Sequence, residues 1–247
     1  SEFKNNQSSS GGGAIYSNGG TITIGANAIF NGNKVEANDG NAYGGAIYND
    51  GGIITITDGA TFINNTTHVN ATGSQGCEGI YTNGGTINII AKTNDVYFGN
   101  AEAYALDNNN GIINLWTSET KKIENNGSIG GEGYDNTAIL NINKPIECYQ
   151  ESVGTGTIEM KASIMSNKIN FYGGTIKICK VPNKDCEATL YANYLEVFNS
   201  PTIDMANDIV EKHNFNNLTV NNKLNLVVDA DLENKKMDEI SATSFSG

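Results

Sequence analysis

A block of sequence that recurs after 32 residues constrains this chain more than any other feature. Residues 12–16 (Gly-Gly-Ala-Ile-Tyr) return unchanged as residues 44–48, residues 19–24 return with one substitution as residues 51–56, and a weaker third copy covers residues 78–89. Repeats with a period of roughly 20 to 50 residues are typical of solenoids, propellers and related arrays. The chain is therefore predicted to be a stack of similar units.

Each copy contains strand signals and no helical signal. Three or four residues alternate apolar with polar between turn pairs such as Gly-Gly or Asn-Gly, and no helical period is sustained. We expect the alternating apolar pairs to lie directly above one another in one hydrophobic column. These pairs are Ile22/Ile24, Ile54/Ile56, Ile87/Ile89, Ile113/Leu115, Leu140/Ile142, Ile158/Met160 and Ile176/Ile178, with Leu195/Val197 and Leu218/Val220 as continuations.

The spacing between these pairs falls from 32 or 33 residues near the start to 18 further on. A parallel β-helix tolerates such variation, because only its short strands must stay in register and extra residues leave as surface loops. The sequence therefore predicts an all-β parallel β-helix of roughly nine to ten coils. It is expected to span residues 11–240, with recognition loops at about 64–79, 117–136 and 180–187.

The two ends are expected to lie outside this domain. Ser1-Glu2-Phe3 looks like a restriction-site scar, so residues 1–10 are predicted to be a cloning scar and a disordered lead. Residues 241–247 are predicted to be a truncated tail. No run of about 18 apolar residues and no signal-peptide pattern occurs.

The charged residues disfavour two classes of interaction. The formal net charge is -12, and all 15 basic residues are lysine. Arginine is the side chain that grips phosphate with a planar fork, and an acidic chain repels the nucleic-acid backbone. We therefore expect neither nucleic-acid binding nor direct insertion into a membrane.

The pairing of Gly-Gly-Ala-Ile with a later Phe-x-x-Asn resembles the repeat motif of the polymorphic outer membrane proteins and related autotransporter passenger domains. This resemblance implies a right-handed coil, export through a β-barrel outside this chain, and bacterial cell-surface display or secretion. It implies an adhesin whose partner is a host-cell protein, a glycan or a neighbouring cell. The motif residues are Gly12, Gly13, Ile15, Phe30 and Asn33, and then Gly44, Gly45, Ile47, Phe62 and Asn65.

Enzymes also use the parallel β-helix, so catalysis is tested residue by residue. A lyase is disfavoured because arginine is absent. A glycosidase needs two carboxylates about 5 to 10 Å apart, yet in the expected ladder Glu159 stacks on Lys177 and no carboxylate pair aligns. His68 and His213 lie in polar stretches and are expected at the surface.

No catalytic residue, metal site or cofactor is therefore predicted. A polysaccharide-degrading enzyme and a purely structural spacer stay open as alternatives. An ice-binding threonine array is disfavoured, because the expected outward column loses its threonines after two coils. That column runs Thr23, Thr55, Asn88, Asn114, Asn141, Glu159 and Lys177.

The four cysteines are too few to build a disulfide framework at this length. Cys179 and Cys186 bracket a turn-rich segment and are predicted to form a disulfide. Cys77 and Cys148 are predicted to be buried thiols.

Overall fold

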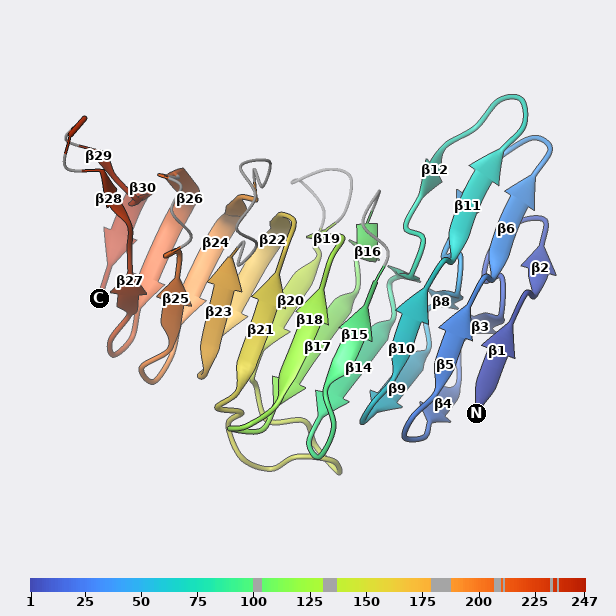
Figure 1. Cartoon of the computed structure of the whole chain (residues 1–247), viewed down its shortest axis with the longest axis horizontal. Helices are drawn as coiled ribbons and strands as arrows, with labels where there is room; N and C mark the ends of the chain where they lie inside the picture. The colour runs from blue at the N-terminus through green and yellow to red at the C-terminus, as the bar shows by residue number, and fades with distance from the viewer. Residues whose placement is uncertain are drawn as a thin grey trace.

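The computed structural model describes residues 1–99, 104–130, 137–178, 188–206, 210, 212–231, 233–234 and 236–247. Every helix or strand assigned in these ranges is a β-strand. Figure 1 shows an elongated, curled stack of strands with the two termini at opposite ends. The chain passes repeatedly around one core, and each pass adds a strand beside the previous one.

One sheet contains nine strands, all in parallel pairs. It forms the front of the molecule in Figure 1. Its strands, in spatial order, are β1 (Glu2–Lys4), β5 (Ile29–Asn31), β10 (Thr61–Ile63), β15 (Val96–Phe98), β18 (Lys122–Asn125), β21 (Thr157–Met160), β23 (Thr175–Ile178), β25 (Thr202–Asp204) and β27 (Asn225–Val227).

A larger, 14-stranded sheet closes the other side and begins as two rows of short strands. The first row is β3 (Ile15–Asn18), β8 (Ile47–Asp50), β13 (Ile80–Asn83), β16 (Tyr104–Asn109) and β19 (Ser128–Gly130). The second row is β4 (Thr21–Ile24), β9 (Ile53–Thr57), β14 (Thr86–Ala91), β17 (Ile112–Thr117) and β20 (Ile139–Ile142).

The two rows merge where the corner glycines end. Gly19, Gly51 and Gly84 hold positive φ angles between the rows, which glycine adopts at little steric cost. In the later passes the chain has no glycine at this corner; the first of them has Ser166-Asn167 there. One long strand then replaces the two short ones. The long strands are β22 (Ile164–Phe171), β24 (Leu190–Val197), β26 (Lys212–Val220) and β30 (Glu239–Ser246).

Short strands extend one edge of the early passes. A three-stranded parallel sheet joins β2 (Gln7–Ser8), β6 (Lys34–Ala37) and β11 (Thr66–Val69), and β7 (Ala42–Tyr43) pairs with β12 (Gln75–Gly76). An antiparallel pair, β28 (Ala230–Asp231) and β29 (Lys236–Met237), lies near the carboxyl terminus.

The predicted loops are therefore partly wrong. The 64–79 segment contains β11 and β12, and the 117–136 segment contains β18 and β19. The third predicted loop, 180–187, lies outside the described residues. Within the described part of the chain, a long excursion at residues 143–156 follows β20 and is called the insert below. It leaves the lower edge of the stack in Figure 1.

The predicted hydrophobic column is correct for its first five pairs and its last two. The two pairs in between, Ile158/Met160 and Ile176/Ile178, belong to the other sheet. Ile22, Ile54, Ile87, Ile113 and Leu140 are in register in the larger sheet, and the column continues through Ile169, Leu195 and Leu218. Ile158 and Ile176 belong to the nine-stranded sheet, beside Ile123 and Ile203. Successive pairs of the column in the larger sheet are therefore 23 to 33 residues apart in the sequence.

The structure at both ends of the chain differs from the sequence-based expectation. Phe3, in the segment expected to be disordered, stacks on Phe30 with ring centroids 4.5 Å apart and lies in β1. Residue 240, the expected end of the domain, lies inside β30, which pairs with β26 as far as Ser246.

The phenylalanines of the motif form a continuous stack inside the core. Phe30, Phe62 and Phe98 are buried, and successive centroids lie 4.6 and 4.7 Å apart with nearly parallel planes. Ile15 and Ile47 stack in the same way in the first row of the larger sheet. The repeat therefore keeps like side chains above one another, the spacing set by neighbouring strands.

The motif asparagines form a buried amide ladder beside that stack. Asn33 donates from Nδ2 to the carbonyl of Phe3, and Asn65 donates to the carbonyl of Phe30, at 2.9 and 3.0 Å. The Oδ1 of Asn65 accepts from the backbone N–H and from Nδ2 of Asn33. Each asparagine thus ties its own pass to the one before, which explains the Phe-x-x-Asn spacing.

The paired glycines are required by close backbone contacts. Gly44 has φ +64, and a Cβ there would collide with the carbonyl oxygen of Ile47. A Cβ on Gly45 would collide with the carbonyl of Glu78 on the next pass. Gly12 and Gly13 have the corresponding contacts one pass earlier.

Candidate functional site

Three tyrosines and an aspartate form a column on the first row of the larger sheet. The register places Tyr16 beside Tyr48, Tyr48 beside Tyr81, and Tyr81 beside Asp107. Their sequence neighbours Ile15, Ile47, Ile80 and Leu106 pack into the core, so this column points outward, since side chains alternate along a strand. Tyr81 contacts Tyr48 edge to face, with centroids 5.0 Å apart.

A second layer covers the end of this column. Tyr43 stacks on Tyr81 with centroids 4.5 Å apart and an interplanar angle of 11°. The pairing of β7 with β12 sets Gly76 beside Tyr43. Because Gly76 has no side chain, the space next to the Tyr43 ring is left unfilled.

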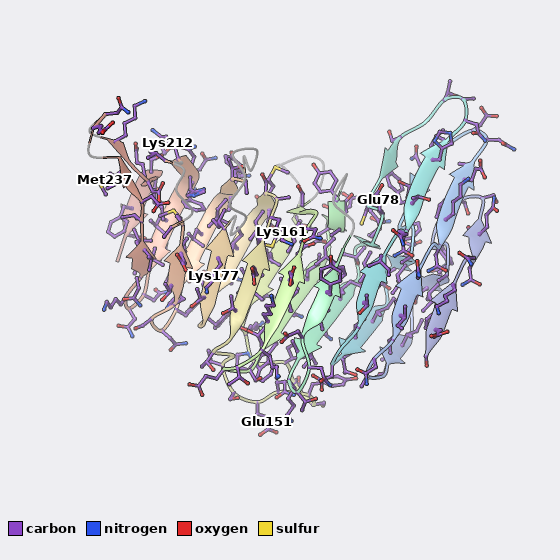
Figure 2. All side chains as sticks on the ribbon, in the orientation of Figure 1. Glu78, Glu151, Lys161, Lys177, Lys212 and Met237 are labelled. Carbon is purple, nitrogen blue, oxygen red and sulfur yellow. The ribbon has the colours of Figure 1, made fainter. Side chains whose placement is uncertain are left out.

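The result is a cavity of about 130 Å³, called the tyrosine pocket below. Its lining residues come from three consecutive passes of the chain, and they are Tyr43, Gly76, Tyr81, Tyr104, Asp107 and Asn109. It lies at the edge where Glu78 is labelled in Figure 2, on the opposite side of the molecule from Glu151 at the tip of the insert.

The described lining of the tyrosine pocket contains one acidic side chain. Asp107 is 4% exposed, and among the described residues the pocket lining includes no lysine. Burial raises the pKa of Tyr81 well above its usual range; a hydrogen bond with the Asn109 side chain opposes this effect, and the nearby Asp107 charge adds to it. Tyr81 is thus a neutral phenol.

The sequence did not point to this pocket as a site. The only available signal was the tyrosine that follows isoleucine in each repeat copy, at positions 16, 48 and 81. Asp107 lies in β16 and is buried, and its sequence neighbours do not set it apart from the other acidic residues.

The insert folds back over the outer face of the second row. Trp116 packs with Ile146 and donates from Nε1 to the carbonyl of Ser152 at 3.0 Å. The hydroxyl of Tyr149 lies 3.3 Å from that of Thr23 in β4, four passes before β20. The insert thus covers a strip of this face.

The outward column on the same face is an amide ladder. Asn88, Asn114, Asn141 and Asn170 are joined by Nδ2-to-Oδ1 hydrogen bonds of 2.7 to 2.8 Å. The expected continuation through Glu159 and Lys177 is wrong, because those residues lie in the nine-stranded sheet. The hydroxyl column itself does end after Thr55, as expected from the sequence.

A charged cluster lies on the nine-stranded sheet, where Figure 2 labels Lys161 and Lys177. Glu124 pairs in register with Glu159, so the expectation that no carboxylate pair aligns is wrong. Lys122 bridges both at 2.8 and 3.0 Å, and Lys161 binds Glu124 at 3.0 Å. Hydrogen bonding to Lys122, and also to Lys161, lowers the pKa of Glu124.

The histidines and cysteines divide between core and surface. His68 is exposed, but His213 is buried and accepts a hydrogen bond from the Leu190 amide at Nδ1, which corrects the expected surface position. Cys77 is a buried free thiol, as predicted, whereas Cys148 is exposed on the insert. Cys179 and Cys186 lie outside the described residues, so their disulfide stays a prediction.

Within the described part of the chain, no three histidine, cysteine or acidic side chains gather as a metal site. The described residues also contain no helix of the length and apolarity needed to cross a membrane.

No protein-family model matches the chain, and no curated protein or solved structure is significantly similar to it.

Proposed function

We propose that this chain is a right-handed parallel β-helix that serves as a surface-displayed binding module, the passenger region of a bacterial autotransporter-like adhesin. The resemblance of the Gly-Gly-Ala-Ile and Phe-x-x-Asn pairs to that family supports the proposal. Nine parallel strands in one sheet agree with nine to ten coils. The right hand is supported by the strong preference of parallel crossover connections.

The observation that carries a binding role is the tyrosine pocket. Ligand sites are concave, lined by aromatic side chains, and contain a few convergent polar groups. The pocket has three tyrosines, a buried carboxylate and an amide on a rigid ladder of strands. A purely structural spacer has no need of such a recess.

A carbohydrate-cleaving enzyme is the second candidate, because Glu124 and Glu159 stand side by side. A glycosidase acid, however, needs a raised pKa so that it is protonated at work. The lysine contacts of Glu124 lower its pKa instead. The pair therefore fits an ion-pair network that keeps the strand face soluble, and the binding role is favoured.

The test is saturable binding of the immobilised protein to host cells and to glycan and protein arrays. Wild type and Tyr104→Ala, which opens one wall of the pocket, are compared. Tyr194→Ala is the matched control, because Tyr194 is 50% exposed on β24, beyond the passes that form the pocket.

We expect wild type and Tyr194→Ala to bind equally and Tyr104→Ala to bind more weakly. The absence of saturable binding by wild type refutes the proposal. Release of reducing ends from a polysaccharide, lost in Glu159→Gln, supports the enzyme instead.

A further inference from the structure

We infer that the open edge of β11, with the tyrosine pocket beside it, binds an extended peptide segment of a partner protein, which adds to the sheet as one more parallel strand. This inference rests on the proposed binding function and names the class of partner. It follows from the unpaired edge, the apolar cluster behind that edge and the position of the pocket.

The edge exists because the fourth pass of the chain is shorter than the third. The third pass connects β10 to β13 through residues 64–79, which contain β11 and β12. The fourth pass connects β15 to β16 with residues 99–103 alone, which are too few to lie beside both strands. Among the described residues, β11 is therefore the last strand of its three-stranded sheet. It reaches beyond the neighbouring fourth pass in Figure 1.

The edge presents a row of backbone donors and acceptors. The amides of Thr66 and Asn70 donate to carbonyls of the second pass at 2.9 Å. Alternate residues of a parallel strand direct their backbone groups to opposite neighbours, so those of Thr67 and Val69 point to the open side. Proline, lysine or a bulge usually protects such an edge, but β11 has a regular register and the sequence Thr-Thr-His-Val. An extended peptide is the kind of ligand that pairs with such a row.

A small apolar cluster behind the edge is incomplete on the open side. Val35, Ala37 and Ala42 are buried, and Val69 is only partly buried against them. The register places Thr67 beside Val35 and Val69 beside Ala37, so an added strand would lay its side chains over Thr67 and Val69. We therefore expect a partner segment that alternates apolar with polar residues, with its apolar side chains toward this cluster.

The tyrosine pocket lies where the same added strand would continue past β12. Gly76 pairs with Tyr43 of the preceding pass and lines the pocket. A Cβ atom on Gly76 would lie 3.6 Å from the Tyr43 ring and 3.7 Å from Oδ2 of Asp107, so side chains in this column point toward the pocket. A partner residue opposite Gly76 would thus direct its side chain to the cavity of about 130 Å³. This contact depends on the shape of the pocket and not on the charge of its lining.

The probe is a synthetic peptide with the sequence of residues 33–45, titrated into the isotope-labelled whole chain and followed by NMR. These residues already pair with the inner side of the same strands, Lys34–Ala37 with β11 and Tyr43 with Gly76. We expect saturable binding and slower amide exchange at Thr67 and Val69. No saturable binding, unchanged exchange at both amides, or equal binding of a scrambled peptide overturns the inference.

Two N-methylated peptides test the backbone pairing without changing the protein. In the expected register the N–H of Glu36 in the peptide donates to the carbonyl of Thr67, whereas the N–H of Ala37 points to solvent. We expect N-methylation at Glu36 to lower the affinity at least about tenfold and N-methylation at Ala37 to lower it less than about threefold. Equal effects of the two modifications contradict the proposed pairing.

On the protein, Thr67→Pro removes one outward N–H, and proline is tolerated on an edge strand where the N–H faces solvent. We expect an unchanged melting temperature and peptide affinity at least about tenfold lower. The matched control is Thr66→Ala, which shortens an exposed side chain of the same strand and keeps its backbone. Peptide affinity that is unchanged in Thr67→Pro, or reduced as much in Thr66→Ala, overturns the inference.

The outcomes separate this inference from the proposed function. Saturable binding to cells, glycans or array proteins by a chain that does not bind the peptide refutes this inference alone. Peptide binding by a chain that shows no saturable binding to cells or arrays refutes the proposed adhesin function alone.

Discussion

Replacement of Asn65 by leucine tests whether the amide ladder holds successive passes together. Asn65 is fully buried and makes three described hydrogen bonds to the preceding pass, two to Asn33 and one to the carbonyl of Phe30. Leucine has a similar volume but neither donates nor accepts a hydrogen bond. The substitution therefore removes the polar contacts and leaves the space filled.

The expected loss follows from what each contact leaves behind. The backbone N–H of Asn33 becomes a buried donor without its acceptor, which costs about 1 to 3 kcal/mol, and each of the other two bonds contributes about 0.5 to 1.5 kcal/mol. We expect the free energy of unfolding to fall by about 2 to 6 kcal/mol. This is a large part of the roughly 5 to 15 kcal/mol that stabilises a typical domain.

Urea unfolding followed by circular dichroism measures the loss, and native-state hydrogen exchange at the Asn33 amide locates it. The control is Asn70→Leu, because Asn70 is exposed and its side chain makes one described bond, to Asn38. We expect that control to change stability by less than about 0.5 kcal/mol. A loss below about 1 kcal/mol in Asn65→Leu, or an unchanged exchange rate at Asn33, would show that the ladder is not a structural link.

Three further predictions address other contacts. Burial acts to raise the pKa of Asp58, but hydrogen bonds from three backbone amides outweigh this effect and lower the pKa below the usual 3.8. Asp58→Asn should therefore lower the free energy of unfolding by about 1 to 3 kcal/mol at pH 7. Urea unfolding at different pH values should show this difference from wild type disappearing as the pH falls below 3.8. With a thiol reagent, exposed Cys148 should react at once and Cys77 only on unfolding, because Cys77 is buried and burial raises its pKa. Ile146→Ser should detach the insert and shift the emission of Trp116, the one tryptophan in the chain, to longer wavelength with little change in melting temperature.

The features that could be predicted from the sequence are those that repeat at fixed intervals. Phe30 and Phe62, or Asn33 and Asn65, lie 32 residues apart and stack directly. Each depends only on its own pass and the next. A period in the sequence is enough to place such residues, because stacking is a nearest-neighbour interaction.

The error in the hydrophobic column has a physical cause. Residues 157–160 read Thr-Ile-Glu-Met and residues 21–24 read Thr-Ile-Thr-Ile, so both alternate as half-buried strands. The pattern of alternation reports which side of a strand faces the core, but not which sheet the strand joins. Only the pairing of β20 with the second half of β22 shows that the larger sheet continues through Ile169.

The tyrosine pocket was missed because it arises where the repeat fails. Position 76 aligns with Tyr43 and, one pass earlier, with Gly11, so tyrosine occurs at this position in one copy of three and the glycine beside Tyr43 leaves space. A faithful continuation of the outward column would have tyrosine at position 107, where Asp107 lies beside Tyr81. A tyrosine at position 76 or 107 would place its ring in the cavity. The regular repeat therefore supplies the rigid walls, and the positions that vary between copies supply the space and the acidic side chain of the pocket.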